Sequence, residues 1–198
     1  MYLRSLKSHL DAHTEWNTFM DFKNVPPWKS ITIPAESLPY GAHKQRQIIK
    51  ELDVENSPRY KPGGGKTYCN IFVRDFLDAM GLQPTHVEGG VELNANAMIE
   101  WLASPKGAST GWIEADRETA LDAAERGHVV LVTYFNHNVN PITKKLRPGH
   151  IAIVLPEGTI AQAGKKNFVG GTIRSGFGDL PVVFFVQSRG PHLAVRTK

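Results

Sequence analysis

The chain changes character at Pro62-Gly63-Gly64-Gly65-Lys66-Thr67-Tyr68-Cys69-Asn70-Ile71-Phe72-Val73, where a glycine run gives way to an apolar segment with helical periodicity. Cys69 is the single cysteine among 198 residues and stands at the expected start of that helix, with Thr67 as the expected N-cap. A thiol in the first turn of a helix lies at the positive end of the helix dipole, which favours the thiolate. We therefore expect the pKa of Cys69 to lie below the ordinary value of about 8.5, as in a nucleophile.

A second interpretation of the same cysteine is that it packs in the core. Free cysteine is among the residue types most often buried, so its position alone does not decide between packing and catalysis. Apolar residues at helical spacing share a face with the cysteine, and Gly81 follows as the expected helix end: Phe72, Val73, Phe76, Leu77 and Met80. The thiol is therefore expected to point toward the core layer.

The composition sets limits on the class of protein. A hydrophobic content of 41% and a charged content of 21% are ordinary for a globular protein, and the length suffices for one substantial core. One cysteine excludes an internal disulfide framework and a zinc site built from several cysteines. No apolar run approaches the ~20 residues of a membrane span, and the N-terminus has no continuous apolar stretch like that of a signal peptide. We therefore expect a protein made in the cytoplasm.

The net charge of +4 is dispersed along the chain and does not indicate which kind of polyanion the protein binds. Nucleic acid, anionic lipid and the anionic bacterial wall are all compatible with it.

The periodicity indicates two parts, an N-terminal extension of uncertain role over residues 1–40 and a single domain over residues 41–198. After residue 40 we expect helices over residues 43–52, 69–80, 95–103 and 117–126, the last two capped by Asn94 and Asp116. Strands are expected over residues 128–135, 150–155, 159–163 and 181–187, where β-branched and aromatic residues gather. Helices first and strands afterwards predict an α+β fold with an antiparallel sheet.

Two polar residues are expected near one open end of that sheet. His150 opens a strand directly after Pro148-Gly149, and a tight turn at residues 156–158 returns the chain so that Gln162 lies near the same end. Cysteine catalysis requires a base within reach of the thiol and a third group that orients the imidazole. Cys69, His150 and Gln162 could fill these roles. The alternatives are a strand-end histidine satisfied by the backbone and a polar residue on a sheet edge.

Three segments carry a resemblance to a known superfamily. Thr67–Val73 at a helix start, Gly127-His128-Val129-Val130 opening a strand, and Gly149-His150-Ile151-Ala152-Ile153-Val154 resemble the papain-like cell-wall hydrolases, namely the CHAP amidases and NlpC-type peptidases. The resemblance covers roughly residues 60–186. It implies a papain-like fold, with the nucleophile helix packed on a small antiparallel β-sheet.

The resemblance also implies roles for particular residues. Cys69 would be the nucleophile, His150 the base and Gln162 the orienting residue, while Tyr60 and Asn70 would bind substrate or the oxyanion. The chain departs from the NlpC pattern in having Tyr68-Cys69-Asn70 where Asp-Cys-Ser is usual, and in having Gln where His, Asn or Glu is common.

The function implied is a peptidoglycan hydrolase, either a cysteine endopeptidase or an N-acetylmuramoyl-L-alanine amidase, that needs no cofactor and no metal. It would act on the wall as a phage lysis enzyme or a delivered antibacterial toxin, with bacterial peptidoglycan as its partner and no nucleic acid. We expect a monomer, with an immunity or export partner in the toxin case. The alternatives are a non-catalytic wall-binding or structural protein on the same fold, and a cysteine hydrolase of another amide substrate.

Two rival site types are disfavoured by spacing. Gly65-Lys66-Thr67 resembles half of a phosphate-binding loop, but Tyr60 stands where that loop needs its first glycine. His128, His137 and His150 are candidate metal ligands, but no His-x-x-x-His pair or matching carboxylate accompanies them. Asp75 and Asp78 are expected to be solvated, and Trp101 and Trp112 to belong to the core.

Overall fold

The computed structural model describes residues 39–83, 87–88 and 91–188, all of which belong to the compact unit formed by residues 33–198. Its first elements are helix α2 (Pro39–Leu52) and the short 3-10 helix η2 (Pro58–Tyr60). The helix expected over residues 43–52 is confirmed, but it starts earlier, at Pro39. The boundary expected after residue 40, between the N-terminal extension and the domain, therefore falls within the first turn of α2. The N-terminal extension otherwise lies outside the described residues.

Helix α3 (Cys69–Met80) begins at the cysteine and ends at Gly81, whose φ of 72° is the left-handed conformation that glycine adopts freely. The expected N-cap was wrong, because Tyr68 occupies that position and makes no side-chain capping bond. Thr67 lies one residue too early to cap this helix. Its hydroxyl hydrogen bonds to the Cys69 thiol instead.

The two other predicted helices are confirmed together with their caps. Asn94 accepts a hydrogen bond from the N–H of Ala97 at the start of α4 (Ala95–Ala103), and Asp116 accepts one from Thr119 at the start of α6 (Arg117–Glu125). Two further helices, α5 (Pro105–Ser109) and α7 (Ile173–Phe177), have five residues each. Such short helices are not apparent from hydrophobic periodicity, which needs several turns to be recognised.

The main sheet has six strands in the order β3-β8-β4-β5-β6-β7, and every neighbouring pair is antiparallel. Four strands fall where the sequence predicts them: β4 (Val130–Tyr134), β5 (His150–Val154), β6 (Ile160–Gln162) and β8 (Val183–Gln187). The two edge strands β3 (Trp112–Ala115) and β7 (Phe168–Gly171) were not predicted. A separate hairpin pairs β1 (Val87–Glu88) with β2 (Val91–Glu92). The α+β class with an antiparallel sheet is confirmed.

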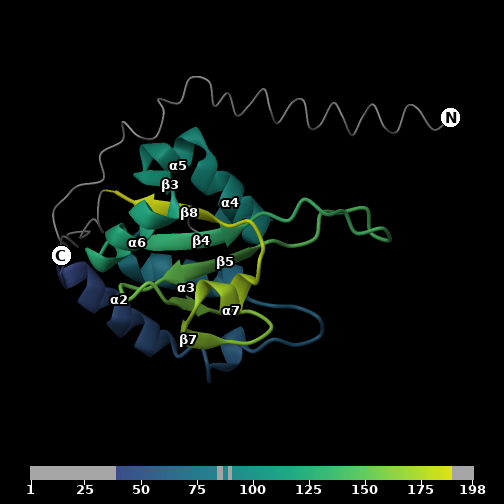
Figure 1. Ribbon diagram of the computed structural model, residues 1–198. Helices are drawn as coiled ribbons and strands as arrows, with labels where there is room; N and C mark the ends of the chain where they lie inside the picture. Colours follow the sequence, from purple (N-terminus) through teal and green to yellow (C-terminus); the bar gives the residue numbers. More distant parts are fainter. Residues whose placement is uncertain (1–38, 84–86, 89–90, 189–198) are drawn as a thin grey trace, which may run out of the picture. The chain divides into compact units, whose positions relative to one another are not determined.

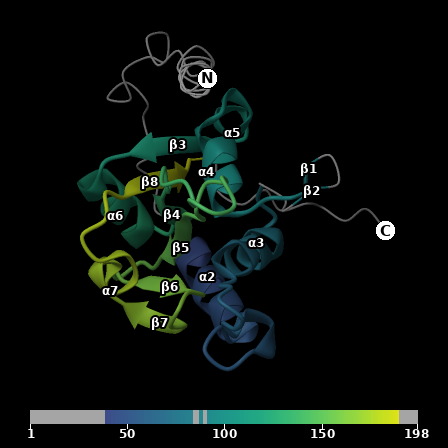
Figure 2. The same ribbon diagram turned by 90° about the vertical axis from the view of Figure 1, so that its right-hand side faces the viewer.

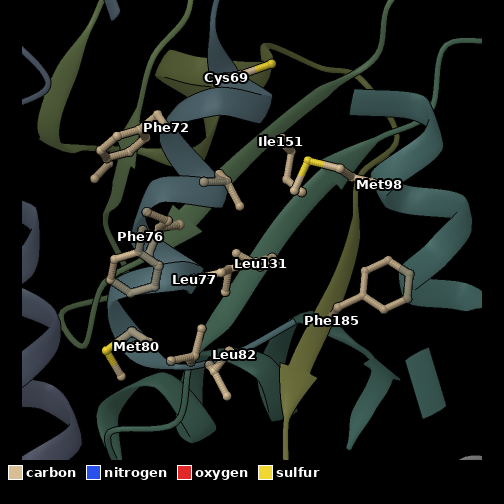
Figure 3. Packing of buried hydrophobic residues seen from close by; sticks show 14 of the residues in the cluster. Cys69, Phe72, Phe76, Leu77, Met80, Leu82, Met98, Leu131, Ile151 and Phe185 are labelled. Atoms are coloured by element: carbon tan, nitrogen blue, oxygen red, sulfur yellow. The ribbon is translucent and has the colours of Figure 1, made fainter. Parts of the chain in front are cut away.

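Helices cover both faces of the sheet, with α2, α3 and α4 on one side and α6 and α7 on the other (Figure 2). Alternate residues of β5 divide between the two cores. Ile151 (Figure 3) and Ile153 belong to the core that contains α3 and α4, whereas Ala152 and Val154 belong to the core that contains α6 and α7. A strand covered on both faces is apolar at nearly every position. This explains why β4 and β5 appear in the sequence as continuous apolar runs.

Between β4 and β5 the chain forms a long excursion over residues 136–149, called the 136–149 arm below, which projects beyond the sheet (Figure 1). A β-bridge between Val139 and Leu146 holds the two sides of the arm together.

Trp101 and Trp112 are 7% and 2% exposed and belong to the core, as expected. Within the described residues, no helix has both the length and the apolar character required to cross a bilayer.

Candidate active site

The Cys69 thiol lies at the start of α3, where that helix packs against β5 (Figure 3). Four donors surround the sulfur, namely the backbone N–H groups of Cys69, Asn70 and Ile151 and the hydroxyl of Thr67. The N–H of Ile151 belongs to the peptide that joins Ile151 to His150. The fold therefore places the sulfur beside the N–H of Ile151, the residue that follows His150 in β5, although 82 positions separate Cys69 from Ile151 in the sequence.

The expected low pKa of Cys69 is corrected by the structure. The residue is only 4% exposed, and burial raises the pKa of its thiol above the ordinary value. The hydrogen bonds from Ile151, Asn70, Cys69 and Thr67 favour the thiolate but do not outweigh burial. Removal from water therefore prevails over the helix N-terminus, and the resting thiol is protonated at neutral pH.

The orientation of His150 is fixed by Gln162. Its Nε2 lies 2.7 Å from the side-chain oxygen Oε1 of Gln162, and the Gln162 Nε2 donates to the carbonyl oxygen of Lys166 at 3.0 Å. Because that carbonyl can only accept, the amide nitrogen must face Lys166 and the amide oxygen must face the imidazole. The imidazole Nε2 therefore carries the proton, which leaves Nδ1 as the basic nitrogen.

The basic nitrogen of His150 has no hydrogen-bond partner within the described part of the chain. This nitrogen, Nδ1, is not among the fully buried polar atoms that lack a partner. The imidazole packs against the Phe177 ring, with centroids 4.8 Å apart. Phe177 belongs to α7, which covers the face of the sheet opposite to α3, and no hydrogen bond joins the imidazole to the Cys69 sulfur within the described residues. Burial lowers the pKa of His150 below its ordinary value, and the hydrogen bond to Gln162 offsets this in part. The histidine is therefore neutral at pH 7 and able to accept a proton.

Two glycines confine the Gln162 amide. A Cβ atom at Gly176 would lie 2.6 Å from Oε1 of Gln162, and one at Gly164 would lie 3.1 Å from its Nε2 and 3.5 Å from Cε1 of His150. Gln162 itself is 4% exposed. A side chain at Gly176 would push the amide away from the imidazole, so the hydrogen bond between His150 and Gln162 depends on this close packing.

Gly149 and Asn96 fix the chain that enters β5. A Cβ atom at Gly149 would lie 2.3 Å from both Oδ1 of Asn96 and the carbonyl oxygen of Tyr134, so only glycine fits there. Asn96, in the first turn of α4, donates to the carbonyl oxygens of Asn136 and Arg147 and accepts from the N–H of Asn136. It thereby holds both ends of the 136–149 arm. Sequence reasoning missed Asn96, because nothing in its local pattern distinguishes it.

An open cavity of about 640 Å³ lies over the start of α3. Asn70 lines it, and the Asn70 side chain donates to the carbonyl oxygen of Leu93 at 3.1 Å. The structure thus places Asn70, one of the predicted site residues, next to the cysteine. The lining of the cavity comes from four segments of the chain: Arg59, residues 65–71 with Arg74, residues 94–95, and Pro148.

Tyr60 is placed differently from the substrate contact expected of it. The side chain is 2% exposed, packs edge-on against Phe72 with ring centroids 5.3 Å apart, and donates its hydroxyl to Asp75 at 2.8 Å. It does not line the cavity beside Cys69. This geometry gives Tyr60 a packing role. The expectation that Asp75 is solvated was wrong. Its side chain is only 12% exposed and forms an ion pair with Arg59.

The other candidate histidines, His128 and His137, do not line the cavity beside Cys69. His128 is 1% exposed and donates from Nδ1 to the carbonyl oxygen of Gln187 at 3.1 Å. His137 packs against Phe135 on the 136–149 arm. Among the described residues, no group of three or more His, Cys, Asp or Glu side chains gathers in a way that could hold a metal ion.

Replacing Gln162 by leucine is expected to lower the pKa of His150 further, because the amide oxygen no longer stabilises the imidazolium. The acid limb of any His150-dependent activity would move to lower pH, and the rate would fall about 10- to 100-fold as the imidazole loses its orientation. NMR titration of the His150 ring protons, assigned with a His150→Gln variant, measures the first effect. An unchanged His150 pKa in Gln162→Leu would contradict this role.

Comparison with known protein families finds no family model that matches the chain, and comparison with curated proteins finds no match either.

Proposed function

We propose that this protein is a cysteine-dependent amidohydrolase in which Cys69 is the nucleophile, His150 the base and Gln162 the residue that orients the base. The observation that carries the proposal is the combination of two facts. The Cys69 sulfur lies beside the N–H of Ile151, the residue after His150, and the hydrogen bond to Gln162 leaves Nδ1 of His150 as the basic nitrogen. Nucleophile, base and orienting group are the three parts that cysteine catalysis requires.

The pKa directions favour a neutral resting pair over a preformed thiolate–imidazolium pair. Burial raises the pKa of Cys69 and lowers the pKa of His150, so both side chains are uncharged at neutral pH. His150 would therefore take the thiol proton as the sulfur attacks the substrate. The hydrogen bond between a catalytic thiol and its base often forms only when substrate is bound.

The reaction would proceed in two stages. The sulfur bonds to the amide carbonyl carbon while Nδ1 of His150 takes the thiol proton. The imidazolium then protonates the amine as the C–N bond breaks, which leaves a thioester on Cys69. Water, deprotonated by the neutral imidazole, attacks the thioester and releases a carboxylate and the free thiol. The N–H groups at the start of α3 would stabilise the developing oxyanion.

The substrate we propose is the peptide part of the bacterial cell wall, cut as an endopeptidase or an N-acetylmuramoyl-L-alanine amidase would cut it. Two observations support this choice. The segments around Cys69 and His150 resemble the papain-like cell-wall hydrolases, and the open cavity beside the thiol leaves room for an extended peptide. The protein would reach the wall after release from the cell or by delivery, as a lysis enzyme or an antibacterial toxin.

Mass spectrometry of purified walls after digestion tests this function. We expect soluble fragments that carry new amine and carboxylate ends, and the masses of these fragments identify the bond. The matched control is the same protein with Cys69 blocked by iodoacetamide, a specific reagent here because the chain has one cysteine. Walls that yield no fragment, or the same fragments with the blocked protein, would contradict the proposal.

The burial of Cys69 also favours one rival, a passive wall-binding protein in which the cysteine is a core residue. Such a protein would sediment with walls and release nothing. It would also keep its wall affinity after alkylation. Fragment release therefore separates the two functions.

A further inference from the structure

The cavity beside Cys69 has a one-sided charge. Of the residues that line it, Arg59, Lys66 and Arg74 are cationic and none is a carboxylate. Any substrate that places its scissile amide against the thiol would lie among these side chains. The positive charge of these side chains therefore influences which amide substrates can bind beside the thiol.

Two of the three cations, Arg59 and Arg74, are paired with carboxylates that do not line the cavity. The Asp75 carboxylate, outside the lining, accepts hydrogen bonds from Arg59 at 2.5 and 3.0 Å and lies 3.2 Å from an Arg74 nitrogen. Asp78 lies 3.4 Å from Arg74. Three cations thus face two carboxylates, which leaves one net positive charge. Arg59 remains half exposed, so its guanidinium can still meet a ligand.

Lys66 supplies the charge that these carboxylates do not balance. It makes no ion pair within the residues described here. A tight turn fixes its position, because Gly63 and Lys66 exchange backbone hydrogen bonds of 3.2 and 2.9 Å. Gly64 and Gly65, between them, have φ values of 58° and 74°, a conformation that favours glycine. The glycine run thus serves to present Lys66 at the cavity.

We propose that this cavity is a carboxylate-binding subsite, and that the substrate carries a free carboxylate close to the amide bond that is cut. This inference rests on the proposed function, because it specifies the substrate of the same thiol. Guanidinium and ammonium groups are the usual protein partners of carboxylates. Peptides with acidic side chains or free carboxyl ends next to the scissile bond would bind, and their amidated counterparts would bind less well.

Alkylation of Cys69 by iodoacetate and by iodoacetamide tests the subsite without any wall substrate. The two reagents perform the same reaction, in which the sulfur displaces iodide, but only iodoacetate carries a carboxylate. We expect the ratio of the iodoacetate rate to the iodoacetamide rate to exceed that of free cysteine by about fivefold or more, and to fall with added salt. A ratio equal to that of free cysteine would overturn the proposal.

Lys66→Gln is the decisive variant, since Lys66 is exposed and its loss leaves no buried charge. It is expected to reduce the ratio about fivefold. Lys50→Gln, an exposed lysine on α2 outside this cavity, is the matched control and should leave the ratio unchanged. Thermal unfolding of both variants checks that the fold is retained. Equal ratios in wild type and Lys66→Gln would contradict the assignment.

The outcomes separate the subsite from the proposed function. A raised ratio that depends on Lys66, together with walls left intact, would support the carboxylate subsite and reject peptidoglycan hydrolysis. Wall digestion with a ratio equal to that of free cysteine would support the hydrolase and reject the subsite.

Discussion

Replacement of Cys69 by alanine is expected to reduce wall hydrolysis by at least about 10³-fold, because no other nucleophile can form the thioester. The side chain is small, so the free energy of unfolding should change by no more than about 1–2 kcal/mol despite its burial. Turbidity loss of purified walls measures the activity, and thermal unfolding measures the fold.

Cys69→Ser is the control for this experiment. It keeps a similar volume and one hydroxyl, yet should be nearly as inactive as the alanine variant, since serine would need a stronger base than a neutral histidine at this site. Undiminished lysis by Cys69→Ala would rule out the mechanism.

Substitution of His150 by alanine is expected to have an effect of similar size, a loss of about 10³-fold, because the protonated thiol then has no acceptor for its proton. In the wild type, the rate should fall on the acid side only as pH drops below about 6.5, since burial lowers the pKa of His150 and keeps it neutral above that value. The double variant Cys69→Ala/His150→Ala should lose no more than either single variant, because the two residues act as one unit.

The control for His150 is His137→Ala, a histidine on the 136–149 arm that packs against Phe135. It should retain activity. A His150→Ala enzyme that keeps more than about a tenth of the wild-type rate would show that another group accepts the proton.

Much of the fold could be predicted because its signals are local. Asn94 and Asp116 precede apolar helical patterns and cap α4 and α6 as expected. The strands β4, β5, β6 and β8 have the β-branched and aromatic composition of buried strands. The edge strand β7 could not be predicted, because Gly170 and Gly171 have low strand propensity and only pairing with β6 makes this segment extended.

Residues of the candidate site could be named from the sequence, but their electrostatics could not. Cys69, His150 and Gln162 carried recognisable sequence signals, and the structure hydrogen bonds the last two to each other. The pKa of Cys69 was predicted in the wrong direction, because the sequence indicates a helix start but not how much tertiary packing covers it. The roles of Asn96 and Arg59 depend on contacts between segments far apart in the chain, so no local pattern shows them.

The Gly-His pair at residues 149 and 150 shows how a short motif reflects tertiary structure. A side chain at position 149 would collide with Asn96 and with the carbonyl oxygen of Tyr134, so glycine is required for β5 to enter the sheet at His150. The glycine of this motif allows the close approach of two backbone segments, and the histidine is the candidate base.

The most direct test of the central claim is the rate of Cys69 alkylation by iodoacetamide, followed between about pH 5 and pH 10 in the wild type and in His150→Ala. If the imidazole takes the thiol proton, the wild type will react at least about tenfold faster than the variant between about pH 6.5 and pH 8, and the variant will show a single rise above the ordinary thiol pKa. Two superimposable profiles would contradict the account, because they would mean that His150 does not act on the Cys69 sulfur.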